Sequence, residues 1–566
     1  MARAVTARED AAALLDTLTA QNAFVTRTGD GVTYRFHHMM KECAARSFQT
    51  LPAADRRAYL DRYGAWYAAH GQYLHAMNAF RASGNADAWL GAVERDAGIL
   101  LSSLPKEEVQ RALSACPDEA LDAHPLALLV LMRCMFTRRC IPEMMQLHAR
   151  FLAAVRAHPE MPDAERDNLL GECDLILSFL YYNDIAAMSR LHRSAGSRMT
   201  RRAFSIQTDG GWTFGSPSVL MMFYRASGEL QSELTEMDEC MPHYYKITNG
   251  HGQGAETIMR AEADFMRACF ADAQIMLERA YAQIDGNGQE NMALCCDFLA
   301  WRLSLCTSFT PRESFEQRRE ALLQQHNVAW LNILQSSCAY YYALLGLPEK
   351  IPAVFREHQL ASIHFLAPGK PMMELIENQV YLAQGEYAKV IGHSEALLGM
   401  CEAMHYALVA LHIRLQTAAA YEMLGKRETA DELLISALAA AEPDALYLPF
   451  VENYRYLKTA LTRGAGAKFA AFVRTVTPLG EDFVRRCGEK RAESSRPAAL
   501  AGLTERESAI AALVAKRLSN REIAEQLFLS EGSVKQYINQ IYSKLLITGD
   551  VRTKRKRLAE LAAPKS

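Results

Sequence analysis

Hydrophobic and polar residues follow each other along most of the chain with the three- and four-residue spacing of amphipathic α-helices. From about residue 60 to residue 480 one such segment succeeds another. In the stretch 420–444 the apolar positions are Tyr421, Leu424, Ala430, Leu433, Leu434 and Leu438. Gly425 lies between the two apolar groups, where a helix end favours a residue that tolerates positive φ. This pattern predicts a helical hairpin.

The hairpin pattern recurs along the chain. Gly346 and Gly385 occupy the position of Gly425 in their own segments, at intervals of 39 and 40 residues. Asn183 and Gly228 mark earlier turns of similar appearance. A period near 40 indicates stacked helical hairpins, slightly longer than the roughly 34 residues of a tetratricopeptide (TPR) repeat. We therefore expect an all-α fold built as a superhelical array of TPR-like hairpins.

Strand-like alternation is scarce, and the best example is "FVTRTGDGVTYRFHH" (24–38). Thr28, Gly29, Asp30 and Gly31 supply turn residues between two short β-rich runs. This segment predicts a β-hairpin near the N-terminus.

The C-terminal region carries strong helix-start signals. "TERE" from Thr504 and "SNRE" from Ser519 both have the form of a capping box, and Ser530 caps a third helix. We expect the first helix to extend to about Lys516 and a last helix to begin near Arg552. In the third helix Val534, Ile538, Ile541 and Leu545 form one apolar stripe, which must face the first two helices.

The opposite face of this third helix is rich in amides, hydroxyls and cations: Ser533, Lys535, Gln536, Asn539, Gln540 and Ser543. Gln and Asn pair bidentately with adenine in the major groove, and Lys binds guanine or phosphate. A short helix, a tight turn and a second helix with such a face is typical of the DNA-binding helix-turn-helix. The alternative is a solvated surface helix; the two capping boxes and the local charge favour DNA binding.

Charge divides the chain into two parts. The formal net charge is −3, yet the stretch 503–566 contains 12 Lys and Arg against 7 Asp and Glu, a net +5, which leaves −8 for residues 1–502. A polar stretch with Pro497 (488–502) separates the acidic body from the basic tail and predicts a linker. We expect a winged-helix-like segment at 1–60, a helical-repeat domain at 61–487 and a helix-turn-helix domain at 503–566.

Cysteine usage and hydropathy indicate a cytoplasmic protein. The 13 cysteines include no C-x-x-C pair, and Cys295 and Cys296 are adjacent, so we interpret most of them as reduced, buried apolar residues. The N-terminus has no signal-peptide pattern, and no apolar stretch approaches the roughly 18–20 residues that span a bilayer.

The motifs "LTERE" and "LVAKRLSNREIAEQLFLSEGSVKQYINQIYSKL" resemble the LuxR-type (NarL/FixJ) DNA-binding domain, as does "GDVRTKRKRLAELA" more loosely. Ser533 stands where the family has Thr, Tyr537 where it has His, and Arg517 and Leu546 where Gly is common. The resemblance implies base reading by Lys535, Gln536 and Asn539, phosphate contacts by Arg521 and Lys544, and a last helix that dimerises. The full DNA-binding set that we predict is Arg521, Ser533, Lys535, Gln536, Asn539, Gln540, Lys544, Arg552, Lys554 and Arg555.

Near the N-terminus, Tyr34, Phe36, His37 and His38 resemble the junction in MalT-like regulators between a winged helix and a helical-repeat sensor. Members of that group have a STAND-class ATPase domain before this junction. This sequence begins at the junction and contains no G-x-x-x-x-G-K-[ST] motif, so either the chain lacks the motor or the sequence is a fragment.

The other notable groups of residues are more typical of binding than of catalysis. Aromatic clusters that include Trp212, His243, Tyr244 and Tyr341 are candidates for a ligand-binding concave surface, although tyrosines also pack between repeats. His37 and His38 are adjacent but lack ligand spacing, so we expect no metal and no cofactor. The sequence also lacks the signatures of catalytic nucleophiles, so we expect no enzyme activity.

These features lead to two hypotheses. The first is a transcription regulator that binds double-stranded DNA as a homodimer, whose repeat domain senses a small molecule or protein, with RNA polymerase as a further partner and no membrane. The second is a TPR-like interaction scaffold whose helix-turn-helix binds DNA weakly or not at all.

Overall fold

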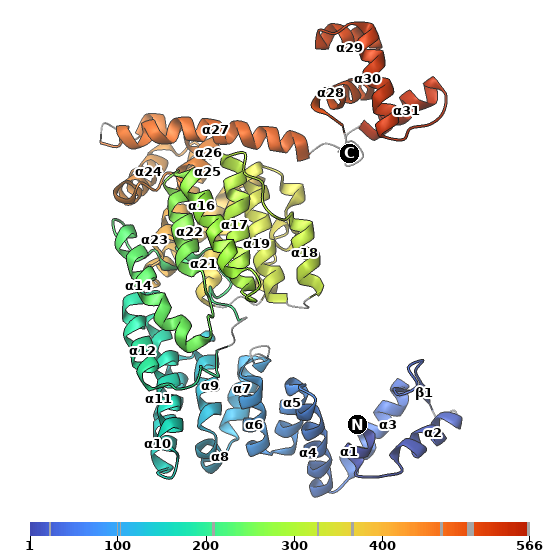
Figure 1. The fold of residues 1–566 in the computed structure, drawn as a ribbon, viewed down its shortest axis with the longest axis vertical. Helices are drawn as coiled ribbons and strands as arrows, with labels where there is room; N and C mark the ends of the chain where they lie inside the picture. The colour runs from blue at the N-terminus through green and yellow to red at the C-terminus, as the bar shows by residue number, and fades with distance from the viewer. Residues whose placement is uncertain are drawn as a thin grey trace.

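The computed structural model describes residues 1–21, 24–98, 100–101, 104–206, 210–324, 328–363, 367–464, 468–494 and 503–562. Within these ranges the chain is almost entirely helical, with a single two-stranded sheet near the N-terminus (Figure 1). This confirms the prediction of a helical fold with a small N-terminal hairpin. Each described helix is too short or too polar to cross a membrane.

The N-terminal segment begins with α1 (Ala2–Thr6) and α2 (Ala11–Ala20). The strands β1 (Val25–Arg27) and β2 (Tyr34–Phe36) then pair antiparallel, and α3 (His38–Thr50) follows. The carboxylate of Asp30 accepts hydrogen bonds from the backbone amides of Val32 and Thr33, which fixes the predicted turn. The next helix, α4 (Ala53–Ala69), continues across the predicted boundary between residues 60 and 61.

Successive antiparallel helices make up the first half of the body (Figure 1). They are α4, α5 (Tyr73–Ser83), α6 (Ala86–Asp96), α7 (Lys106–Ser114), α8 (Asp118–Ala123), α9 (Pro125–Thr137), α10 (Ile141–Ala157), α11 (Asp163–Ser178) and α12 (Ile185–Arg198). Their apolar faces contribute to one continuous core that extends through the rest of the body. Each helix can bury its apolar stripe only against its neighbours, which is why the pattern requires stacking.

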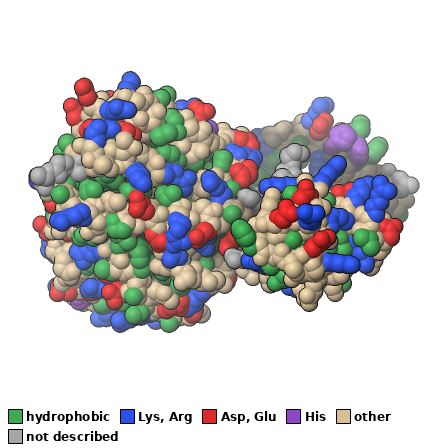
Figure 2. Space-filling view, turned by 90° about the horizontal axis from the view of Figure 1, so that it is seen from above, with side chains coloured by type: hydrophobic (Ala, Val, Ile, Leu, Met, Phe, Trp, Pro, Cys, Tyr) green, Lys and Arg blue, Asp and Glu red, His purple; other side chains and the backbone are tan. Residues whose placement is uncertain are grey.

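The second half of the body continues in the same manner. Its long helices are α14 (Leu230–Thr248), α15 (Ala255–Met266), α16 (Phe270–Ile284), α17 (Glu290–Cys306), α18 (Phe315–Gln324), α19 (Val328–Leu345), α21 (Lys370–Gln384), α22 (Tyr387–Ala403), α23 (Ala407–Met423) and α24 (Arg427–Ala441). The helices α25 (Leu448–Glu452), α26 (Tyr454–Gly464) and α27 (Ala470–Ser494) complete it. On the face seen in Figure 2, Lys and Arg side chains are interspersed with Asp and Glu over this body.

The predicted turns are found at three glycines, but the repeat is not uniform. Gly346, Gly385 and Gly425 have φ of 71°, 78° and 75°, and each follows a long helix. After Gly346, however, the chain forms only a 3-10 turn and the short α20 (Ala353–Arg356) in place of a full second helix. Gly228 lies in a turn between the short helix α13 and α14 rather than between two long helices. A regular TPR-like superhelix therefore stays a prediction.

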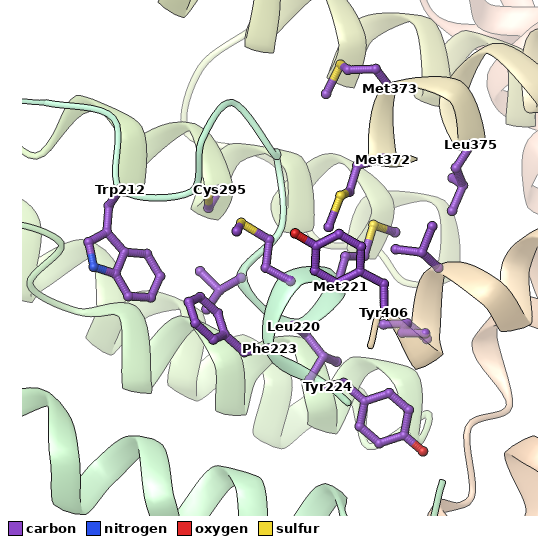
Figure 3. Packing of buried hydrophobic residues seen from close by; sticks show 14 of the residues in the cluster. Trp212, Leu220, Met221, Phe223, Tyr224, Cys295, Met372, Met373, Leu375 and Tyr406 are labelled. Carbon is purple, nitrogen blue, oxygen red and sulfur yellow. The ribbon is translucent and has the colours of Figure 1, made fainter. Parts of the chain in front are cut away.

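A buried segment joins the two halves of the body. The short helix α13 (Val219–Phe223) is wholly buried, and Figure 3 shows its side chains among Trp212, Cys295, Met372 and Tyr406. Residues 224–228, which we call the strap, then pass over α23 and α24. Asp444 Oδ2 accepts from the Tyr224 hydroxyl at 2.7 Å and from the Gly228 amide at 2.6 Å. The strap thus fastens segments that lie more than 200 residues apart.

The C-terminal domain consists of α28 (Glu505–Ala515), α29 (Asn520–Leu527), α30 (Glu531–Lys544) and α31 (Val551–Ala562). Its apolar core shares no described residue with the core of the body. The preceding helix α27 continues through Ser494, into the range 488–502 that we expected to be a linker. The remainder of that range lies outside the described residues.

Candidate nucleic-acid interface

Both predicted capping boxes form in the C-terminal domain. At the start of α28 the Thr504 amide donates to Glu507 Oε2 at 2.7 Å, and Thr504 Oγ1 accepts from the Glu507 amide. Ser519 and Glu522 make the same reciprocal pair at the start of α29. Because each box satisfies amides that a helix end leaves unpaired, both helices begin at defined residues.

The predicted apolar stripe of α30 faces the domain core. Val534, Ile538 and Ile541 are buried, with exposed fractions of 0%, 4% and 0%, while Leu545 is half-buried and packs against the same core. Since α30 packs on both α28 and α29, this stripe fixes the rotation of the helix about its own axis. The opposite face must therefore point to solvent.

That opposite face presents polar groups that are free to bind. The side chains of Lys535, Gln536, Asn539 and Gln540 are exposed and have no hydrogen-bond partner in the described part of the chain. Ser533 is half-buried, and its hydroxyl lies 2.8 Å from that of the capping residue Ser530. Four adjacent unpaired donors and acceptors on a helix of this kind match the requirements of a major-groove reader.

Two of the predicted DNA-binding cations are already engaged within the domain. Lys544 Nζ donates to Glu507 Oε2 at 2.7 Å, and Glu507 is almost fully buried. Burial acts to raise the pKa of the Glu507 carboxyl, but the hydrogen bonds from Lys544 and Thr504 outweigh it and lower that pKa. Arg555 donates to Asn520 Oδ1 at 2.7 Å and to the Leu518 carbonyl at 2.6 Å. Lys544 and Arg555 therefore fasten helices to one another.

The remaining predicted cations lie at the surface or near it. Arg521 is exposed and forms an ion pair with Glu525 at 3.2 Å along α29. On α31, Arg552 is exposed, and Lys554 is half-buried with its ammonium 5.9 Å from the centre of the Tyr542 ring. The sequence did not indicate that Glu507 and Asn520 anchor cations, because those partners lie 37 and 35 residues away.

The first three helices of the domain end at non-glycine residues with positive φ. Arg517, Phe528 and Leu546 have φ of 63°, 54° and 50°. After α28 the Leu518 amide donates to the Leu513 carbonyl and the Arg517 amide to the Val514 carbonyl, which together form a Schellman motif. Arg517 and Leu546 thus adopt the left-handed conformation that Gly usually provides at these turns, although a residue with a side chain is unfavourable there.

Arg517→Gly is expected to stabilise the C-terminal domain by about 0.5–1 kcal/mol, because glycine reaches the left-handed conformation without a Cβ penalty. Amide hydrogen exchange of α28–α31 in the full chain measures the change. The matched control is Arg521→Gly, which places the same substitution inside α29 and is expected to destabilise the domain by a similar amount. If both substitutions changed the stability of the domain in the same direction, the explanation from the left-handed conformation of Arg517 would be contradicted.

The four aromatic candidates for ligand binding lie within or beside the core of the body. Trp212 is buried and stacks on Phe223, with 4.9 Å between ring centres. Tyr244 is buried and its hydroxyl lies 2.7 Å from His251 Nδ1, whereas His243 and Tyr341 are half-buried. Burial raises the pKa of Tyr341, whose ring packs against Phe315. Ligand binding by these four residues stays a prediction.

The adjacent histidines His37 and His38 near the N-terminus contact each other, and His37 caps a helix. His37 and His38 have ring centres 4.2 Å apart, and His37 Nδ1 accepts from the Met39 amide to cap α3. In the part of the chain that the structure describes, His, Cys, Asp and Glu do not form a group of three that could hold a metal ion.

Two segments match known protein families. Residues 501–555 match the bacterial regulatory proteins of the luxR family, and residues 1–56 match the MalT winged helix domain. The transcriptional regulatory protein LnrK of Bacillus subtilis (strain 168) is 44% identical over 55 residues, which are 10% of this chain and 25% of LnrK. The match thus spans about a quarter of that relative. The chain carries a LuxR-type helix-turn-helix domain at its C-terminal end and a MalT-type winged-helix segment at its N-terminal end.

Proposed function

We propose that the protein is a sequence-specific transcription regulator whose helical body senses a small molecule or a protein partner. The observation that carries DNA binding is the outward face of α30, where Lys535, Gln536, Asn539 and Gln540 are exposed and unpaired in the described structure. The similarity to the luxR family and to a transcriptional regulatory protein supports the same role.

In this proposal the chain acts in the cytoplasm without enzyme activity. Residues 61–487 form the sensor, and the C-terminal domain pairs with a second copy on two half-sites about 10 base pairs apart or a multiple of that. Ser533, Arg521 and the cations of α31 contact the groove edge and the phosphates. RNA polymerase is the partner through which DNA binding would affect transcription.

A second candidate is an interaction scaffold with weak DNA binding. It is favoured by the ion pair between Lys544 and Glu507 and by the hydrogen bonds of Arg555, since these cations are occupied within the domain. Fewer free cations mean fewer phosphate contacts and a shallower dependence of affinity on salt.

Gln536→Ala separates the two candidates. The duplex is selected from a random pool by the wild-type chain. On it we expect Gln536→Ala to lose about 1–3 kcal/mol of binding free energy relative to wild type, and this difference to disappear when the base pair that Gln536 reads is changed. Fluorescence anisotropy at two salt concentrations measures it. The control is Gln231→Ala, the same change at an exposed position on α14 of the body. Weak binding to every duplex that is unchanged by Gln536→Ala would favour the scaffold.

A further inference from the structure

A groove of about 810 Å³ opens on the helical body between α22 and α24. The helix α23 forms its floor, and residues of the strap also line it. Its apolar lining includes Leu398 of α22, Leu411 and Tyr421 of α23 and Leu433 of α24. The volume lies within the range of about 300–1,000 Å³ that is common for small-molecule sites, and such sites favour junctions between structural units.

Arg414 lies on the floor of this groove. It follows Leu411 by three residues and precedes Tyr421 by seven, so the three side chains share one face of α23. The side chain of Arg414 is half-buried, yet no hydrogen bond or ion pair engages its guanidinium among the described residues. Placing a cation part-way into a low-dielectric groove is unfavourable unless an anion is available to pair with it.

A second arginine approaches from the strap. Arg225 lines the same groove, and its Nε is buried without a partner in the described structure. Among the described residues Arg225 has one ion pair, and it is long, with 3.6 Å between Nη1 and Asp184 Oδ2. The groove therefore holds two guanidinium groups with unused hydrogen-bonding capacity, and arginine matches the planar geometry of a carboxylate.

Acidic groups restrict the ligand further. Glu395 and Glu402 of α22 line the groove from its exposed rim, where His405 also lies. These carboxylates disfavour a ligand with several negative charges, such as a phosphate ester, because like charges repel. The apolar residues among the lining favour a ligand whose remaining part is hydrophobic.

We infer that this groove binds a monocarboxylate with an apolar body. The carboxylate pairs with Arg414, and the body lies along Leu398, Leu411 and Tyr421. A free organic acid and the C-terminus of a short apolar peptide both supply this chemistry. That such a ligand acts as the effector rests on the proposed sensing function: the groove is lined by the strap, which connects the two halves of the body, and by α22, α23 and α24 of the second half, so an occupant contacts both the connection and the second half.

The test uses the full chain without DNA, so its outcome is independent of whether the C-terminal domain binds DNA. The probe is 11-(dansylamino)undecanoate, followed by its fluorescence, with the methyl ester of the same molecule as the neutral control. We expect the ester to bind about 10–100-fold more weakly, because it has no carboxylate to form charge-assisted hydrogen bonds with Arg414. In competition, a short apolar peptide with a free C-terminus reports whether a peptide can replace the acid, and its amidated form is the control.

Arg414→Gln is expected to weaken probe binding by about 10–100-fold, and Arg414→Lys by less because it keeps the charge. Arg427→Gln, an exposed arginine of α24 outside the groove, is expected to leave binding unchanged. Circular dichroism of each variant confirms that it is folded. Equal affinities for acid and ester, equal affinities of Arg414→Gln and wild type, or no binding of either the probe or the free-acid peptide up to about 1 mM would each overturn the inference.

Discussion

Glu452→Ala is expected to lower the free energy of unfolding of the helical body by about 3–5 kcal/mol. In the folded chain Arg302 donates to both carboxylate oxygens of Glu452, at 2.8 and 3.1 Å, and both side chains are 1% exposed. The Tyr340 hydroxyl adds a third hydrogen bond at 2.8 Å. Removing the carboxylate leaves a guanidinium buried without its counterion, which costs far more than the pair itself contributes.

Equilibrium unfolding in urea measures this loss. The triple variant Arg302→Met, Glu452→Leu, Tyr340→Phe replaces the buried polar group with apolar side chains and is expected to recover most of the stability. Glu481→Ala breaks the solvent-exposed pair with Lys458 and is expected to leave the midpoint unchanged. If Glu452→Ala and Glu481→Ala shifted the midpoint equally, the argument from burial would fail.

The C-terminal domain was predictable because its signals are local. Each capping box spans four residues, and the stripe of α30 spans twelve, so the sequence contains the whole pattern. Once Val534, Ile538 and Ile541 are placed inward, the exposure of Gln536 and Asn539 follows from helix geometry. The turns at Gly385 and Gly425 were predictable for a similar reason, since glycine marks the end of a helix.

Contacts between distant residues were not predictable in this way. Nothing near Lys544 indicates that Glu507 will bind it, and nothing near Tyr224 indicates Asp444. The truncated hairpin after Gly346 was also missed, because Pro348 and Pro352 interrupt the helix while the turn glycine stays in place. Arg414 could have been noticed as a charged residue within the apolar face of α23, but its neighbours in the groove come from three other segments.

Ile541→Ala is expected to destabilise the C-terminal domain by about 2–5 kcal/mol. Ile541 is fully buried against the core that α28, α29 and α31 share, and a domain of this size rarely has more than about 3–5 kcal/mol in total. A large fraction of the domain should therefore unfold. Hydrogen exchange of α28–α31 in the full chain measures the unfolding, and binding to the selected duplex is expected to fall in parallel.

The comparison with Gln536→Ala distinguishes folding from recognition. Gln536→Ala is expected to change affinity without changing hydrogen exchange, since its side chain is exposed and makes no hydrogen bond or ion pair within the described part of the domain. Ile541→Val, which removes one methyl group, is expected to cost only about 0.5–1.5 kcal/mol and to keep most binding. Full amide protection in Ile541→Ala would mean that α30 does not depend on this stripe for its orientation, and the assignment of its outward face to DNA would then lose its physical basis.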